Sequence, residues 1–85
     1  MLKIYGNMLC PDCVACVAAL DASGMEYEFL DIGNSLPNLK AFLAIRDSSK
    51  LFDEVRSRGA IGIPCLVNGE KISLTWDAYV TQADA

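Results

Sequence analysis

The segment LKIYGNMLCPDCVACVAAL (residues 2–20) passes from a strand pattern to a helix pattern at two closely spaced cysteines. Leu2–Tyr5 is a short β-type run, and a loop with Gly and Asn follows it. Pro11 suits the first turn of a helix because its missing N–H costs nothing there. Asp12 suits the positive end of the helix dipole. We therefore predict a strand, a loop and then a helix from Asp12 to Ser23.

The remaining patterns predict an α/β chain with the element order β-α-β-α-β-β-α. Because a helix joins the first two strands, we expect them to be parallel, with a right-handed crossover. The last two strands flank Asn68-Gly69 and should form a hairpin. This order predicts a four-stranded mixed sheet with helices on both faces. The expected elements after the first helix are a strand at Glu26–Ile32, a helix after the Ser35 cap, a second helical piece through Val55, strands at Ile63–Val67 and Lys71–Leu74, and a helix at Thr75–Gln82.

Composition narrows the classes of function. The chain has 85 residues, which make one domain (residues 1–85), with 53% hydrophobic residues and a net charge of −4. The seven basic residues are scattered along the sequence and not clustered. A basic patch of the kind that binds nucleic acid or an anionic membrane is therefore not expected. No signal peptide and no bilayer-spanning run is visible. We therefore expect a cytoplasmic monomer that binds neither nucleic acid nor membrane, and its lack of His leaves catalysis to Cys, carboxylates, Lys, Tyr or backbone groups.

Cys10 and Cys13 have the spacing of a redox pair. Cys10 precedes the expected helix, where unpaired N–H groups and the helix dipole stabilise a thiolate. Cys13 lies one turn further, close enough to attack a mixed disulfide formed on Cys10. A Cys-x-x-Cys pair at a strand–loop–helix junction therefore predicts thiol–disulfide exchange. In a reducing cytosol, such a pair is more often catalytic or metal-binding than a structural disulfide.

Two other cysteines leave a metal or iron–sulfur protein as an alternative. Cys-x-x-Cys-x-x-Cys plus the distant Cys65 provides four thiolates, the number that a cluster needs. Against this, three cysteines along one helix do not readily surround one ion. We expect no metal, with Cys16 and Cys65 packing as small hydrophobic residues. A cluster shared by two chains through Cys10 and glutathione stays open as a variant, as does a partner-binding module without catalysis.

Pro64 stands where the third strand is expected to begin. Proline removes a hydrogen-bond donor from a sheet and is normally kept out of inner strands. A cis Ile63–Pro64 bond close to the redox pair is one solution. A proline at the edge or first residue of the strand is the other.

These motifs together resemble the glutaredoxin family of the thioredoxin-fold superfamily. CPDC (residues 10–13) follows the first strand, and GIPCLVNGEKI (residues 62–72) follows two helical segments. The resemblance implies a thioredoxin fold, with Cys10 as nucleophile, Cys13 as resolving thiol and Pro64 as the cis-proline facing them. It also implies that the Ile63 backbone pairs with glutathione or with a disulfide-bearing protein substrate. Glutathione is the implied reductant.

The sequence departs from the family pattern at several positions. Asp12 replaces the Tyr of Cys-Pro-Tyr-Cys, and Asn7 stands where a Lys often precedes the nucleophile. The family's Gly-Gly-x-Asp segment aligns with residues 73–76, followed by Asp77, so Thr75 and Asp77 are the candidate residues for gripping glutathione. This poorer match makes a glutathione-independent redoxin, recharged by thioredoxin reductase, the alternative within the class.

Pro11 and Asp12, which separate the two cysteines, are expected to modulate them. A carboxylate beside a thiol disfavours the thiolate and opposes the helix dipole. We therefore hypothesise a more reducing protein than one with Tyr at this position. Titration of Cys10 in the wild type and in Asp12→Asn tests this, and a thiolate that forms no more readily in the variant contradicts it.

The remaining polar and aromatic residues have simple interpretations. We expect Arg46, Arg56 and Arg58 to form a solvated face, with a grip on a glutathione carboxylate as the alternative. Trp76 should pack at the start of the last helix.

Overall fold

A four-stranded mixed sheet forms the centre of the molecule. The computed structural model describes residues 1–80, and the strand order in its sheet is β2-β1-β3-β4. β1 pairs in parallel with β2, as predicted, whereas β1–β3 and β3–β4 are antiparallel. The strands are β1 (Leu2–Gly6), β2 (Tyr27–Asp31), β3 (Cys65–Asn68) and β4 (Lys71–Ser73).

Helical segments connect the strands in the predicted order. The α-helices are α1 (Pro11–Ala22), α2 (Leu36–Ser48) and α3 (Asp53–Ser57), and the 3-10 helices are η1 (Lys50–Phe52) and η2 (Asp77–Tyr79). The predicted Ser35 cap is confirmed, because the Ser35 hydroxyl accepts a hydrogen bond of 3.2 Å from the backbone N–H of Asn38. Such a cap satisfies one of the free amides in the first turn.

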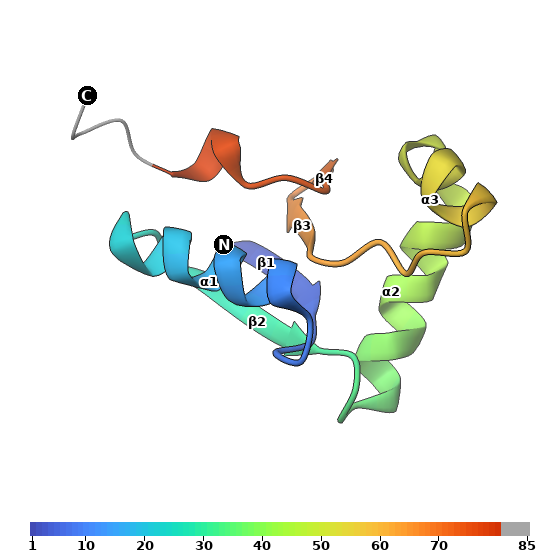
Figure 1. Ribbon diagram of the computed structural model, residues 1–85, viewed down its shortest axis with the longest axis horizontal. Helices are drawn as coiled ribbons and strands as arrows, with labels where there is room; N and C mark the ends of the chain where they lie inside the picture. The colour runs from blue at the N-terminus through green and yellow to red at the C-terminus, as the bar shows by residue number, and fades with distance from the viewer. Residues whose placement is uncertain (81–85) are drawn as a thin grey trace.

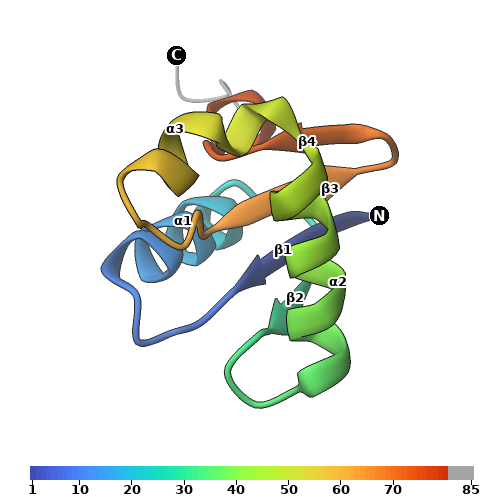
Figure 2. The same ribbon diagram turned by 90° about the vertical axis from the view of Figure 1, so that its right-hand side faces the viewer.

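Helices cover both faces of the sheet, as predicted. Figure 2 shows α2 crossing in front of β1 and β3, with α1 behind the sheet, and Figure 1 shows the same layers edge-on. Because side chains alternate along a strand, Ile4 and Tyr5 of β1 enter different cores. Ile4 packs with Leu20 of α1, whereas Tyr5 packs with Phe42 of α2. Phe42 also meets Phe52 edge-on, with 6.1 Å between the ring centroids.

The predicted final helix, Thr75–Gln82, is wrong over its described part. Only the three residues of η2 are helical there, and Gln82 lies outside the described residues. The Thr75 backbone N–H bonds to the Ser73 hydroxyl, and no side chain caps η2. Without a cap, so short a segment lacks the hydrogen bonds that offset helix nucleation. Trp76, Tyr79 and Val80 instead pack against the core beside α1.

The hairpin is confirmed, but its turn is one residue later than predicted. Asn68 pairs with Lys71, so the loop is Gly69–Glu70 rather than Asn68–Gly69. Gly69 has a φ of 64°, which the first central position of a type II′ turn requires. Asn68 is therefore the last residue of β3.

Candidate active site

Cys10 stands at the point where the chain enters α1. It is the N-cap residue, with extended backbone angles, and its carbonyl accepts the first hydrogen bond of the helix from Val14. Its thiol is half-buried, whereas Cys13, one turn further, is fully buried. The first turn of α1 thus presents one accessible sulfur with a second sulfur behind it.

Burial of Cys13 depends on the close approach of β1. A Cβ atom at Gly6 would lie 2.8 Å from the Cys13 sulfur, so any side chain there would displace the thiol. Burial is the main cause that raises the pKa of Cys13 to about 11; the neighbouring Cys10 contributes in the same direction, and the Asn7 backbone acts in the opposite direction. Cys13 is therefore protonated at neutral pH.

The loop before Cys10 is held by Asn7 and Asp31. The Asn7 amide nitrogen donates to an Asp31 carboxylate oxygen at 3.1 Å, and its carbonyl oxygen accepts from the Leu9 N–H at 2.9 Å. The same Asp31 oxygen accepts from the Gly33 N–H. These bonds tie the loop after β1 to the loop after β2. Asn7 thus positions the loop that leads to Cys10.

The bond between Ile63 and Pro64 is cis, as the sequence suggested. Pro64 is buried, and the residues before it lie against η1 and α3: a Cβ at Gly62 would come within 2.7 Å of the Phe52 ring. Arg46 of α2 donates to the carbonyls of Ala60 and Ile61 at 2.7 and 2.9 Å. Charge-assisted bonds of this kind fix the approach of the chain to the cis bond.

The prediction of a solvated arginine face is therefore wrong for two of its three members. Arg46 binds the carbonyls just described, and Arg56 donates to the carbonyls of Arg46 and Ser49 and pairs with Asp53. Arg46 joins α2 to the loop ahead of Pro64, whereas Arg56 joins α3 to the end of α2. The spacing of residues along the helices could not distinguish these two arginines from an exposed one, because most of their partners are backbone carbonyls in other segments of the chain.

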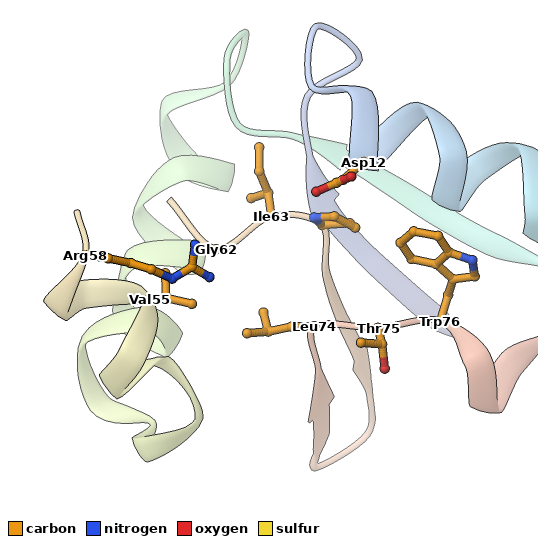
Figure 3. Close-up of a pocket in the computed structure, with 9 residues that line it drawn as sticks. Asp12, Val55, Arg58, Gly62, Ile63, Leu74, Thr75 and Trp76 are labelled. Carbon is orange, nitrogen blue, oxygen red and sulfur yellow. The ribbon is translucent and has the colours of Figure 1, made fainter. Parts of the chain in front are cut away.

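The third arginine, Arg58, lines a pocket of about 330 Å³. We call it the polar pocket because its lining includes two charged residues, Asp12 and Arg58. Figure 3 shows Arg58 on one side of this pocket and Asp12, Thr75 and Trp76 on the other. The two charges come from α1 and from the end of α3. The nine lining residues of this polar pocket are Asp12, Val55, Arg58, Gly62, Ile63, Pro64, Leu74, Thr75 and Trp76.

A second cavity, of about 420 Å³, is lined in part by Cys10. We call it the Leu9–Ile61 groove, after its two exposed large hydrophobic residues. Ile63 lines both this groove and the polar pocket, so the cis-proline segment separates them. The groove is lined by Asn7, Leu9, Cys10, Ile32, Gly33, Ile61 and Ile63.

One curated relative covers most of the chain. A protein of Haemophilus influenzae, described as an "Uncharacterized protein", is 46% identical over 65 residues, which are 74% of this chain and 76% of the relative. The chain belongs to the family of this protein. No family model matches the sequence, and no solved structure matches it. Membership of this family brings no activity with it, so the function has to be argued from the site.

Cys16 and Cys65 lie away from the accessible thiol. Cys16 is fully buried in the core beside α1, and Cys65 is fully buried in the opposite core. Burial raises the pKa of Cys16 to about 11 and that of Cys65 to about 12. The packing roles predicted for both are confirmed by their position. Within residues 1–80, no cluster of three or more Cys, Asp or Glu side chains is arranged to hold a metal ion, and every helix there is too short or too polar to cross a bilayer.

The structure brings together most of the predicted site residues. Cys10 shares a cavity with Ile63, and Asp12 shares the polar pocket with Pro64 and Thr75. Pro11 is the exposed first residue of α1. The prediction for Asp77 is not supported in this way, since it starts η2 and does not line the polar pocket. Asp77 lies in the 3-10 helix η2, which stands where the longer final helix was predicted.

Sequence reasoning did not select Leu9 or Ile61 as cavity residues, and it offered Arg58 only through the alternative of a grip on a glutathione carboxylate. Leu9 and Ile61 are isolated apolar residues in loops, and Arg58 was grouped with the other arginines. Position relative to the motifs was the available signal: Leu9 directly precedes Cys10, while Ile61 lies three residues before Pro64.

Proposed function

We propose that this protein is a glutaredoxin-like thiol–disulfide oxidoreductase of thioredoxin fold that uses Cys10 and Cys13. The observation that carries the proposal is the pairing of a half-exposed Cys10 at the N-terminus of α1 with a buried Cys13 one helical turn further along. The strand order β2-β1-β3-β4 and the cis bond before β3 support the assignment of the fold.

The proposed reaction begins with the Cys10 thiolate. It attacks one sulfur of a substrate disulfide, a Cys10–substrate mixed disulfide forms, and the other substrate sulfur leaves as a thiolate. The free amides in the first turn of α1 favour an anion at this position. Cys13 keeps its proton at this stage, so it does not compete as a nucleophile.

The second step uses the buried thiol. Cys13 gives up its proton and its sulfur attacks the Cys10 sulfur of the mixed disulfide, releasing the substrate as a thiol. The dithiol has then lost two electrons and two protons to the substrate disulfide, and Cys10–Cys13 is oxidised. Because the Cys13 thiolate is scarce at neutral pH, we expect this second step to accelerate with increasing pH.

The polar pocket is the proposed place for the polar part of the substrate. Arg58 offers a cation on one side of the pocket, and Asp12 offers an anion on the other side, where Thr75 also lies. A molecule that carries both an ammonium and a carboxylate, such as the γ-glutamyl end of glutathione, complements this arrangement. Glutathione is therefore the first reductant to test, and thioredoxin reductase the second.

Cysteine variants test the proposal. In a glutathione-coupled assay of a mixed disulfide, we expect wild type to turn over and Cys10→Ser to be inactive. Cys13→Ser should trap a mixed disulfide on Cys10, which intact-mass measurement detects. Cys16→Ala, a cysteine of the same helix that lies in the core, is the matched control and should remain active.

Reduction of the oxidised wild-type protein discriminates between the two reductants. Oxidised wild type is incubated with glutathione or with thioredoxin reductase and NADPH, and recovery of the Cys10 thiol is followed. Recovery with either reductant supports the dithiol cycle and names its electron donor. If no Cys10–Cys13 disulfide forms under oxidation, or if Cys16→Ala is as inactive as Cys10→Ser, the proposal is wrong.

A further inference from the structure

The Leu9–Ile61 groove differs in character from the polar pocket on the other side of Ile63. None of its lining residues, all within the described part of the chain, is an Asp, Glu, Lys or Arg. Leu9 is 92% exposed and Ile61 is 56% exposed. Cys10 lines the same groove, so a molecule joined to Cys10 by a disulfide is brought close to these side chains.

Three polar groups of the groove, the two ends of the Asn7 side-chain amide and the Gly33 N–H, already have partners. Both ends of the Asn7 side-chain amide are bonded, to Asp31 and to the Leu9 N–H, and the Gly33 N–H is bonded to Asp31. A ligand placed here would therefore lose hydrogen bonds to water without gaining new ones from these groups, which costs free energy for any polar ligand. An apolar side chain has no such loss.

Charge excludes an acidic occupant in the same way. The Asp31 carboxylate lies directly behind Asn7 and Gly33, and the chain has a net charge of −4. A carboxylate in the groove would meet a like charge and no lining cation, an arrangement that disfavours the charged form. The one cation among the residues of the two cavities, Arg58, lines the polar pocket instead.

We infer that the Leu9–Ile61 groove selects disulfide substrates in which a large apolar side chain lies next to the reacting cysteine of a peptide segment. This inference rests on the proposed dithiol activity and names its substrate class. The volume of about 420 Å³ is within the range of sites that hold small ligands. Burial of the substrate side chain would also cover Leu9 and Ile61.

The chemical step is the thiol–disulfide exchange proposed above, and the groove changes only the rate at which a given substrate undergoes it. The Cys10 thiolate attacks the sulfur of the peptide cysteine, the existing S–S bond breaks, and the other sulfur leaves as a thiolate. While the new Cys10–peptide disulfide forms, the neighbouring apolar side chain occupies the groove. Apolar pockets discriminate single methylene groups by ~10- to 200-fold, and a groove this open should lie at the low end of that range.

Peptides that report their own reaction test the inference. Each short synthetic peptide has one cysteine bearing a thionitrobenzoate group and flanked by Leu, Ser or Asp. The thionitrobenzoate disulfide of glutathione serves for comparison. The absorbance of released thionitrobenzoate gives the second-order rate constant, which is divided by the rate constant with dithiothreitol to remove intrinsic reactivity. Intact mass in Cys13→Ser identifies the peptide on Cys10.

We expect the Leu peptide to react about 10-fold faster than the Ser peptide, and the Asp peptide to be slowest. Leu9→Ser and Ile61→Ser should reduce this Leu-to-Ser ratio towards one. Leu51→Ser replaces a leucine that is 46% exposed, close to the value for Ile61, and that does not line the groove, so it should keep the wild-type ratio.

Two results would overturn the inference while leaving dithiol chemistry intact. One is equal normalised rates for all disulfides, or the fastest rate for glutathione. The other is a Leu-to-Ser ratio that is the same in Leu9→Ser and Ile61→Ser as in wild type. Absence of any Cys10-dependent release would instead refute the proposed function, and the inference with it.

Discussion

Alkaline pH should destabilise this protein through its three buried thiols. Burial raises the pKa of Cys13 and Cys16 to about 11 and that of Cys65 to about 12, against an ordinary value of 9.0. At pH 10 the unfolded chain has released most of these protons, whereas the folded chain retains them. Since one pKa unit corresponds to about 1.4 kcal/mol, each thiol should reduce the free energy of unfolding by about 1.4 kcal/mol between pH 7 and 10.

The direction follows from proton counting. A folded state with raised thiol pKa values binds more protons than the unfolded state above pH 9, so its stability decreases as the pH rises further. Below pH 9 the contribution is fully present. The expected loss for the three thiols is about 4 kcal/mol at pH 10, a large part of the ~5–15 kcal/mol that stabilises a small domain.

Urea unfolding at pH 7 and pH 10, with a phosphine reductant, measures this loss. In Cys65→Ala the loss between the two pH values should be smaller than in wild type by about 1.4 kcal/mol. Val55→Ala is a control that truncates a buried residue of the same core without removing a titrating group, and should show the wild-type loss. An equal loss in Cys65→Ala and wild type would refute the claim that burial penalises the Cys65 thiolate.

Three substitutions test how the loops and helix ends are held. Gly62→Ala should destabilise by about 1–3 kcal/mol in thermal unfolding, because Gly62 has a φ of 92° and an added Cβ would meet the Phe52 ring; unchanged stability would contradict the close packing. Arg46→Met should cost about 2–3 kcal/mol and slow reduction of substrate disulfides, because two carbonyls ahead of the cis bond lose charged donors. Arg46→Lys should restore only part of both losses, and full restoration would show that the paired geometry is unimportant. Ser35→Ala should cost about 1 kcal/mol by chemical denaturation, whereas Ser57→Ala, at the end of α3, should change stability little; equal effects would argue against the cap.

Most of the fold follows from local patterns, because strands and helices differ in the period of their apolar residues. Pro11 and Ser35 sit at the starts of α1 and α2, within a residue of where their chemistry predicts. The prediction of the last helix was wrong because tertiary packing, and not local sequence, decides the structure there. Trp76 and Val80 have apolar spacing suited to a helix, but they pack beside α1 on an irregular segment with only one 3-10 turn.

The site divides in the same way. Cys10, Cys13 and Pro64 are recognisable from sequence because their roles depend on a helix terminus and on backbone geometry close to them in the chain. The role of Arg46 could not be predicted, since its acceptors are carbonyls 14 and 15 residues away. For the same reason the sequence could not show that Arg58 lies opposite Asp12, because this arrangement exists only once α3 has packed in the folded protein.

Local sequence is thus sufficient to place the first thiol at the start of α1, because a loop, a proline and an apolar helix pattern are consecutive in the chain. It is also sufficient to make the second thiol its neighbour, since three residues are nearly one helical turn. Only tertiary structure could decide what surrounds the first thiol. The apolar groove at Cys10 and the charged pocket beyond Ile63 are built from loops and helices that are distant in sequence. Their contacts come from burial of apolar surface, which depends on three-dimensional proximity and leaves no periodic trace along the chain.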